Sequence, residues 1–483
     1  MNVQRTGIVL KPDPARVLFR PLNFLDDQRC LRVLSRVLAL SEEEVGVTLT
    51  QVLAEFHTRH QRLRDYFLVR FQAVQHLLPT NQPLSEQRQL LIGSYFTQEY
   101  SLEAAALFNP SIIPHPDQTR LPDGVLRFIL SLRATGEGHL SSITFRTGTV
   151  NETGHIVVDT PTRFVTTPEH IPHASYDKTL FWRKLQELGV ADTVSDVILS
   201  NMGANFTVDE LTQEITFLRR HARHRNSEFD RSASRMINLA LSNYEVVYTP
   251  DQPITERIIF PHSPNESNGI EDARFVRFTE EDGSITYLAT YTAYDGRVTI
   301  PQLLETRDFS HFHISTLNGP EVQNKGMALF PRKINGRYAT LSRQDGENLY
   351  IMFSEELHFW HTKIPLLKPT YSWEFLQLGN CGSPIETDAG WLVLTHGVGP
   401  MRKYSIGAIL LDRENPERVI GRLKQPLLTP NETEREGYVP NVVYSCGALV
   451  HGGILILPYA MSDTASSFVT VPLNELLAEM TAI

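Results

Sequence analysis

A five-fold repeat of short β-type segments is the feature of this sequence that most restricts its fold. In each copy a polar or small residue leads into an apolar strand, a turn containing glycine follows, and a second alternating strand ends in polar residues. In the last four copies the turn glycines stand at positions 283, 336, 390 and 453, so they are separated by 53, 54 and 63 residues. This spacing is the length of one four-stranded propeller blade with its loops. The sequence therefore predicts a mainly β fold, a five-bladed β-propeller.

Two helical segments interrupt the repeat. From about residue 25 to 78, and again from about 176 to 241, apolar residues recur at three- and four-residue spacing with charges between them. Ser41 followed by Glu44 resembles a capping box that opens a helix. The long interval from the first turn glycine, Gly124, to Gly283 is explained if the second helical segment is inserted between blades one and two. The predicted domains are an N-terminal strand and helical extension over 1–98 and the propeller over 99–483, with the helical insertion at about 175–242.

Composition restricts the partners. The formal net charge is −10, and acidic and basic residues are mixed along the whole chain, which argues against a nucleic-acid binder. The N-terminus has no signal-peptide core, and no stretch approaches the roughly 20 apolar residues that span a bilayer. The three cysteines, at positions 30, 381 and 446, have no metal-ligand spacing and suit a reducing compartment. We expect a cytoplasmic protein without a metal site and without nucleic-acid or membrane partners.

The repeat also predicts a binding site. Innermost strands of a propeller converge on its axis, so equivalent positions from different blades come together. In this sequence those positions carry Asn109, Asp272, Lys325, Ser383 and Asn441, and the ends of the next strands carry Arg133, Asp295, Arg343, His396 and Asp463. Convergence of polar groups in one funnel is the default hypothesis for a ligand site in such a fold.

Asp272 is the best candidate for an acid in this funnel. It lies in the segment GIEDARFVRF, between Glu271 and Arg274, directly before an apolar strand. A carboxyl beside another carboxyl can be held protonated near neutral pH, as a general acid requires. The alternative interpretation is that Glu271, Asp272 and Arg274 form a structural salt bridge at the start of the strand.

A second, basic cluster falls on the third and fourth copies of the repeat. Its members are Lys325, Arg343, His396, Arg402, Lys403 and Tyr404. Arginine offers a planar fork that matches phosphate oxygens, and lysine offers a point charge. A solvated surface would also explain Arg402 and Lys403, and a buried position in the run WLVLTHGVG would also explain His396. Taken together, the cluster favours an anion site.

These segments resemble a known family. GIEDARF is similar to the GxEDPR motif of glycoside hydrolase family 130, the β-mannoside phosphorylases, with Ala273 in place of the usual proline. Four further segments resemble the family and keep its order, over roughly Asn109 to Phe468: NKGMALFP, GSPIETDAGWLVLTHGV, YSIGAILLDRENPERVIGRLKQPLLTP and YVPNVVYSCGALV. The helical additions resemble the longer branch, which contains enzymes acting on β-1,2-linked mannooligosaccharides.

The resemblance implies a reaction and a set of roles. The reaction is inverting phosphorolysis of β-mannosides with release of α-D-mannose 1-phosphate, and Asp272 would be its general acid. Phosphate would be bound by Arg343, His396, Arg402, Lys403 and Tyr404. The sugar would be bound by Asn109, Ser111, Arg133, Glu271, Arg274, Tyr294, Asp295, Asn324, Lys325 and Asp463. Because phosphate is already an anionic nucleophile, one acid and a cationic cradle suffice, and no cofactor is expected.

Several alternatives stay open from the sequence. The linkage could be β-1,4, as in mannosyl-glucose or mannooligosaccharide phosphorylases. A β-mannosidase on the same fold would need a second carboxylate to activate water. A sugar-binding propeller without catalysis and a protein-interaction scaffold belong to different functional classes. We also expect that the helical additions could form a homodimer contact.

Overall fold

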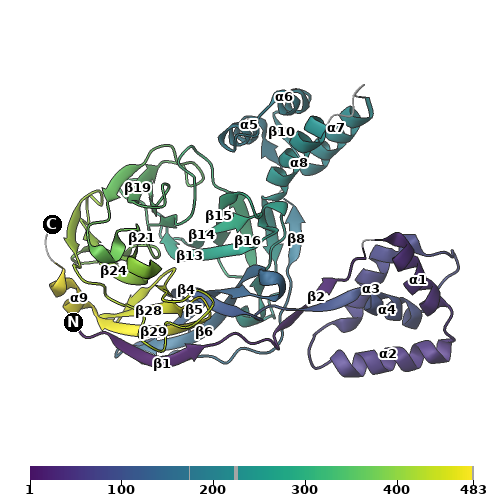
Figure 1. Ribbon diagram of the computed structural model, residues 1–483, viewed down its shortest axis with the longest axis horizontal. Coiled ribbons are helices and arrows are strands. Elements are labelled where there is room, and N and C mark those ends of the chain that lie inside the picture. Colours follow the sequence, from purple (N-terminus) through teal and green to yellow (C-terminus); the bar gives the residue numbers. More distant parts are fainter. Residues whose placement is uncertain (25, 173–174, 222–226, 481–483) are drawn as a thin grey trace.

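The computed structural model describes residues 1–24, 26–172, 175–221 and 227–480, and these residues form a mainly β protein with two helical groups (Figure 1). The body contains five antiparallel sheets of four to six strands. Each predicted copy of the repeat supplies the strands of one sheet, so the sheets are numbered here in chain order.

The bounds of the strands follow this order. The first sheet contains β4 (Ala106–Pro114), β5 (Val125–Thr135), β6 (Ser141–Asn151), β7 (Ile156–Val158) and β12 (Ile258–Ile259). The second contains β8 (Glu169–Pro172), β11 (Tyr244–Val247), β13 (Ile270–Thr279), β14 (Ile285–Tyr294), β15 (Thr299–Thr306) and β16 (His311–Thr316). The third contains β17 (Ala328–Leu329), β18 (Tyr338–Ser342), β19 (Leu349–Ser354) and β20 (Ile364–Leu367). The fourth contains β21 (Gln377–Asn380), β22 (Ile385–Thr387), β23 (Gly390–Val398), β24 (Tyr404–Leu411) and β25 (Val419–Arg422). The fifth contains β26 (Val443–Tyr444), β27 (Leu449–His451), β28 (Ile454–Met461), β29 (Ala465–Pro472) and β1 (Gln4–Leu10).

The repeated glycines occupy the same place in all five sheets. Residues 124, 283, 336, 390 and 453 each lie where the chain turns from the first strand segment of a copy into the next strand. All five have a positive φ, between 74° and 138°. Glycine adopts this left-handed region without the steric cost that other residues meet, so the same turn selects the same residue five times.

Each sheet contacts the next one in the chain. β4 contacts β13, β14 contacts β17, β18 contacts β21 and β24 contacts β26. β28 of the fifth sheet contacts β4 of the first, so the succession of contacts returns to its start. Apolar clusters fill the spaces between sheets; Phe145 of the first sheet, for example, packs edge-on against Phe275 of the second, with ring centroids 6.0 Å apart.

The two ends of the chain meet in the fifth sheet. β1 pairs with β29 in antiparallel orientation, with Gln4 opposite Thr470. The terminal amine lies 3.4 Å from Glu479 in the last helix, α9 (Leu473–Glu479). The sequence predicted an N-terminal strand but not its partner. Figure 1 shows β1 running along the edge of the body beside β29.

The N-terminal helices project from one side of the body (Figure 1). They are α1 (Asp27–Leu38), α2 (Glu42–Phe56), α3 (Leu63–Val74) and α4 (Glu86–Tyr95), and the paired strands β2 (Val17–Pro21) and β3 (Thr97–Ser101) connect them to the sheets. The capping box at the start of α2 is confirmed: the Ser41 amide donates to Glu44 Oε2 at 2.7 Å, and the Glu44 amide donates to Ser41 Oγ at 3.2 Å. α4 was not predicted from the sequence.

A buried ion network fixes this connection to the first sheet. Glu103 follows β3 and is completely buried. Its carboxylate lies 2.9 Å from Arg16 Nε and 2.7 Å from Arg146 Nη2. Arg16 also donates to the carbonyl oxygens of Thr162 and Thr255. Three segments far apart in the sequence are therefore joined at one carboxylate.

The second helical group lies in the chain between β8 and β11, two strands of the second sheet. It consists of α5 (Lys178–Glu187), α6 (Thr193–Ser200), α7 (Val208–His221) and α8 (Ser227–Leu241), with the short strand pair β9 (Tyr176–Asp177) and β10 (Asn205–Phe206). We call residues 175–221 and 227–242 of this group the insertion. β8 and β11, which flank it, extend the second sheet beyond β16. Among the described residues, no helix has the length and apolar character needed to cross a membrane.

Candidate active site

Irregular backbone near the start of β4 and β13 shapes the site. The pairing of β4 with β5 shifts its register between Phe108 and Ser111, and that of β13 with β14 shifts between Glu271 and Arg274. The residues in these breaks, Asn109 and Asp272, have φ values of 49° and 54°. Asparagine and aspartate tolerate this left-handed region better than most residues, and a bulge redirects the side chain that it carries. The local sequence thus turns both side chains out of the regular ladder.

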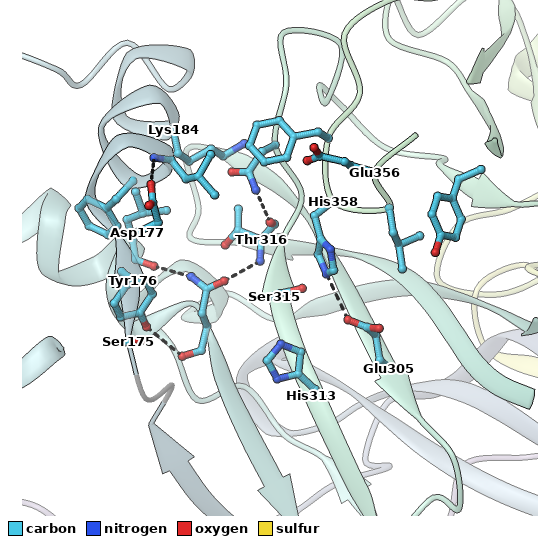
Figure 2. A pocket seen from close by; sticks show the side chains of 18 of the residues that line it. Ser175, Tyr176, Asp177, Lys184, Glu305, His313, Ser315, Thr316, Glu356 and His358 are labelled. Carbon is cyan, nitrogen blue, oxygen red and sulfur yellow. Dashed lines mark hydrogen bonds and ion pairs between the residues drawn. The ribbon is translucent and has the colours of Figure 1, made fainter. Parts of the chain in front are cut away.

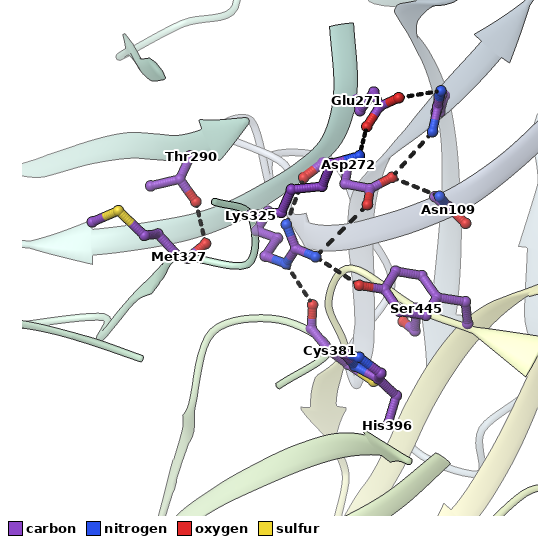
Figure 3. A network of polar contacts seen from close by, with 12 residues as sticks. Asn109, Glu271, Asp272, Thr290, Lys325, Met327, Cys381, His396 and Ser445 are labelled. Atoms are coloured by element: carbon purple, nitrogen blue, oxygen red, sulfur yellow. Dashed lines mark hydrogen bonds and ion pairs between the residues drawn. The ribbon is translucent and has the colours of Figure 1, made fainter. Parts of the chain in front are cut away.

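The Asp272 carboxyl group lies among donors and cations (Figure 3). Asn109 Nδ2 donates to its Oδ1 at 2.6 Å. Arg133 Nη1 lies 3.6 Å from Oδ1, and Arg274 Nη2 lies 3.9 Å from Oδ2. The residue is only 8% exposed. The site therefore holds one buried carboxyl between two guanidinium groups.

Glu271, the neighbour of Asp272, is engaged elsewhere. Arg133 Nη2 donates to its Oε1 at 3.0 Å, and the Lys325 ammonium contacts its Oε2. Glu271 therefore links cations from the first and third copies of the repeat. It does not form a carboxyl pair with Asp272.

The electrostatics of Asp272 correct the expectation from the sequence. Burial by itself would raise the pKa of this carboxyl, but the charges of Arg133, Arg274 and Lys325 and the hydrogen bond from Asn109 together lower it below 3.8. The expectation that Glu271 holds Asp272 protonated is wrong for the ligand-free protein, because opposite charges outweigh the neighbouring carboxylate. Without a ligand, Asp272 is ionised near neutral pH.

Asp463 carries the second carboxyl of the cluster, in the turn between β28 and β29. Burial, and after it the charge of Asp272, raises the pKa of Asp463 to about 6, although Arg133 and Arg402 act in the opposite direction. Its backbone also has a positive φ, 52°. Two carboxyl groups with opposite pKa shifts thus share one site.

A chain of buried contacts leads from Asp272 toward the fourth sheet. Arg274 is almost completely buried, donates through Nε to the carbonyl oxygen of Cys381 at 2.9 Å, and donates through Nη2 to the Tyr444 hydroxyl at 2.7 Å. The Tyr444 ring meets the His396 ring edge-on with centroids 5.0 Å apart. Tyr444 was not among the predicted site residues, although it lies in the segment YVPNVVYSCGALV, three positions after Asn441.

His396 does not add positive charge to this cluster. It is completely buried, and burial, followed by the charges of Arg343 and Arg274, lowers its pKa well below 6.5. Its Nε2 lies 3.2 Å from Gln377 Nε2 and 3.5 Å from Arg343 Nη1. The sequence placed His396 in a basic cluster; in the structure it is a neutral group that packs beside Arg343.

Arg343, like Arg133 beside Asp272, has spare hydrogen-bonding capacity. Its Nε is buried and has no hydrogen-bond partner among the described residues. A Cβ at Gly326 would lie 2.8 Å from this atom, and one at Gly379 would lie 2.9 Å from Arg343 Cδ, so both glycines make room for the side chain. An unsatisfied buried N–H of a guanidinium group suits an anionic oxygen.

The other predicted anion ligands lie at the surface beside this group. The Tyr404 ring stacks on His396 at 6.0 Å, and the Arg402 guanidinium lies 5.9 Å from the Tyr404 ring centroid. Arg402 and Lys403 are exposed. Among the described residues no contact joins the Lys403 side chain to the cluster.

Several predicted sugar ligands have other partners. Ser111 is completely buried, and its hydroxyl accepts a hydrogen bond from the Phe275 amide at 3.1 Å, so it joins the first and second sheets. Asp295 accepts from the amides of Arg297 and Val298 in its own turn, and Asn324 donates to the Gln344 carbonyl at 3.3 Å. Tyr294 ends β14, and no contact of its side chain with the cluster is found among the described residues.

The cluster as a whole suits proton transfer from a carboxyl group to a bound anionic or neutral polar ligand. Within the described ranges, no three His, Cys, Asp or Glu side chains gather in a way that could hold a metal ion. What the site offers is a buried carboxyl, Asp272, a second carboxyl of high pKa, Asp463, and guanidinium groups on both sides.

Comparison with known sequences identifies the family. The family model of glycoside hydrolase family 130, described as beta-1,4-mannooligosaccharide phosphorylase, matches residues 208–482. The chain belongs to glycoside hydrolase family 130. The match begins inside the insertion and includes Asp272, Arg343, His396 and Asp463.

Named members of family 130 are similar to the chain over a little less than half of its length. A 1,2-beta-oligomannan phosphorylase of Thermoanaerobacter sp. (strain X514) is 36% identical over 222 residues, which are 44% of this chain and 70% of that protein. A beta-1,2-mannobiose phosphorylase of Listeria innocua is 30% identical over 46% of this chain and 63% of that protein. A solved structure of a Listeria innocua beta-1,2-mannobiose phosphorylase with beta-1,2-mannobiose has 21% identity and a TM-score of 0.46, over 78% of this chain and 92% of that chain.

Proposed function

We propose that the protein is an inverting glycoside phosphorylase that cleaves β-1,2-linked mannooligosaccharides with inorganic phosphate and releases α-D-mannose 1-phosphate. Membership of family 130 supports the reaction class, because the family model is described as a phosphorylase. Two relatives at 30–36% identity are named for β-1,2-linked substrates, which supports the linkage. Phosphate is a co-substrate in this proposal, and no cofactor takes part.

The scaffold in this proposal is a five-bladed β-propeller. The contacts that run from the first sheet through the fifth and back to the first support it, as do the five equivalent turn glycines. In such a ring, the bulges of the innermost strands face the central axis, so Asn109 and Asp272 meet there although 163 positions separate them. The binding funnel then follows from the architecture.

One observation carries the proposal: a buried carboxyl, Asp272, shares a cluster with a guanidinium group, Arg343, whose Nε–H has no partner among the described residues. A hydrolase needs a base that activates water in addition to its acid. Phosphate needs only to be held in position, because it is already charged. Because Asp463 is a second carboxyl of the same site, the unsatisfied Arg343, and not the number of carboxyl groups, favours phosphate over water here.

The reaction proceeds in one displacement. A phosphate oxygen, held by Arg343 and by Arg402 at the surface, attacks the anomeric carbon of the terminal mannosyl unit from the face opposite the glycosidic oxygen. The C–O bond to the leaving sugar breaks as the new C–O bond to phosphate forms, so the configuration inverts. Asp272 supplies the proton for the leaving oxygen, directly or through a sugar hydroxyl, and the proton of hydrogen phosphate restores it. Atoms and charge balance without a further reactant.

Phosphate also prepares the acid. In the ligand-free protein the surrounding cations keep Asp272 ionised. A bound dianion neutralises part of that positive field and thereby raises the pKa of a nearby carboxyl. We propose that Asp272 acquires its proton when phosphate binds, so that the acid is protonated only in the complex that can react.

In this proposal the polar groups around Asp272 bind the sugar. Asn109 and Arg133 come from the first sheet, Asp463 from the fifth, and the Glu271–Lys325 pair from the second and third copies of the repeat. Together they offer donors and acceptors on several sides of the carboxyl, as recognition of a sugar ring with many hydroxyl groups requires. The homodimer through the helical groups and the cytoplasmic location stay predictions of the sequence.

Product analysis tests the proposal. The protein is incubated with β-1,2-, β-1,3- and β-1,4-mannobiose, with and without phosphate, and α-mannose 1-phosphate is measured by chromatography. We expect release from the β-1,2-linked substrate only when phosphate is present. Equal sugar release with and without phosphate would indicate a hydrolase, and release from β-1,4-mannobiose alone would assign the other linkage.

A further inference from the structure

A second cavity lies between the insertion and the body of the protein (Figure 2). Its volume is about 700 Å³, and it is open to solvent. α5 and the end of α8 form one wall, β15 and β16 of the second sheet form the floor, and the segment 355–359 after β19 forms the opposite wall. Because Asp272 lies on β13, two strands away from β15, this cavity is separate from the candidate active site.

The floor presents a row of polar groups from one face of the sheet. Glu305 on β15 stands opposite His313 on β16, and Ser315 follows two positions along, so all three side chains point to the same face. His358 Nε2, from the opposite wall, lies 3.1 Å from Glu305 Oε1. Figure 2 shows Ser315 between Thr316 and this pair.

One hydroxyl group at the floor is unsatisfied. Ser315 is 8% exposed. Its Oγ has no hydrogen-bond partner among the described residues. A buried hydroxyl without a partner is unfavourable. A ligand that supplies hydrogen-bonding groups at this position would remove that cost.

The remaining lining restricts the chemistry of the ligand. Carboxylates of Glu280, Glu305, Glu355 and Glu356 exclude an anion. A metal ion is disfavoured because no group of three suitable ligands occurs in the described part of the chain. Lys184 in the wall adds no free charge, because it donates to the Leu317 carbonyl at 2.6 Å and lies 3.4 Å from Glu187. An organic cation is therefore the competing occupant, and the spermidine titration below tests it.

A neutral ligand rich in hydroxyl groups fits all of these features. Its hydroxyls can donate to the carboxylates and can pair with Ser315, while its ring packs on the aromatic side chains of Phe181, Tyr338 and Phe359. We propose that this cavity is a second carbohydrate site, which binds sugar units of an oligosaccharide away from Asp272. The choice of a mannooligosaccharide as that ligand rests on the proposed function.

Calorimetric titration in phosphate-free buffer tests the site, because phosphorolysis cannot proceed there. We expect the full chain to bind two equivalents of β-1,2-mannobiose. Ser315→Trp fills the cavity and should bind one equivalent while its kcat and its KM for phosphate stay unchanged. Ser200→Trp, which places the same ring on an exposed position of the insertion, should keep both sites.

A second variant keeps the test valid if Ser315→Trp does not fold. Glu305→Gln keeps the shape of the floor but removes a charged acceptor, and should weaken the second site about tenfold or more, the equivalent of about 1.4 kcal/mol. The unfolding temperature of each variant is measured in parallel.

Three outcomes would overturn the proposal. The first is one equivalent bound equally by the wild-type chain and by Ser315→Trp. The second is an unchanged second site in a folded Ser315→Trp or in Glu305→Gln. The third is spermidine binding that Ser315→Trp abolishes, which would identify a cation site. Failure of the proposed function is seen separately, as absence of α-mannose 1-phosphate from wild-type reactions with phosphate.

Discussion

Replacement of Asp463 by asparagine should stabilise the protein at alkaline pH. The side chain keeps its shape and loses its charge. In the folded protein, burial and the charge of Asp272 raise the pKa of Asp463 from 3.8 to about 6, so the ionised carboxylate is disfavoured there. At pH 8 the wild-type chain must carry this charge in the folded state, whereas Asp463→Asn does not.

The sign and size of the effect follow from the pKa shift. A raised pKa in the folded state gives a contribution to stability that is fully present below pH 3.8 and is lost as the pH rises through 6. The shift of about two pKa units corresponds to about 3 kcal/mol at pH 8 and about 1.5 kcal/mol at pH 5. We therefore expect Asp463→Asn to exceed the wild-type free energy of unfolding by up to these amounts.

Urea unfolding at pH 5 and pH 8, followed by tryptophan fluorescence, measures the difference. Asp388→Asn, in the exposed turn before β23, is the matched control and should change little at either pH. An equal difference at both pH values, or a variant less stable than the wild type at pH 8, would refute the reasoning. An equal difference would mean that the pKa of Asp463 is not shifted on folding. A less stable variant at pH 8 would mean that Arg133 and Arg402 stabilise the Asp463 carboxylate more than Asp272 and burial destabilise it. In an Asp272→Asn background, the pH dependence should shrink.

Three further predictions concern activity and stability. Asp272→Asn should lower kcat by about 10²–10⁴-fold. It should also lower the unfolding temperature, because Arg133 and Arg274 lose a counter-charge, so kcat is measured below that temperature. In the wild type, the acidic group that limits kcat at saturating phosphate should have a higher pKa than the one that limits kcat/KM, as pH profiles of α-mannose 1-phosphate release would show. Arg343→Gln should raise the KM for phosphate about tenfold or more in initial-rate assays. Lys403→Gln, at an exposed position, should change this KM less than about twofold. Equal effects of the two variants would contradict the assignment of Arg343. Glu103→Gln leaves the buried Arg16 and Arg146 without their counter-charge. It should lower the free energy of unfolding by about 3–5 kcal/mol in urea titrations. A loss below about 1 kcal/mol would contradict a tightly paired network.

Local rules of the sequence predicted the elements whose cause is local. The five turn glycines could be placed because a left-handed turn selects glycine wherever it occurs. The capping box at Ser41 and the helical character of both additions could be recognised because apolar spacing and cap chemistry depend on neighbours within a few positions. Asp272 could be singled out because its motif and its place before an apolar strand lie within one short segment.

Partners far apart in the chain could not be predicted in this way. The pairing of β1 with β29 joins the two ends of the chain, and the sequence of neither strand indicates which strand it pairs with. Ser111 was expected to bind sugar, but its hydroxyl bonds to Phe275, 164 positions away. Tyr444 was missed because only its contact with Arg274 connects it to the site.

The period of the repeat, the helical additions and the candidate acid could all be predicted without a structure, because each depends on residues that are close together in the chain. The tertiary structure alone decided the charge states. Asp272 is ionised and Asp463 is not fully so, since the pKa of a buried carboxyl depends on charges brought within a few ångströms from other sheets. His396 is neutral for the same reason: burial and two arginines act on one ring that the sequence shows only among apolar residues.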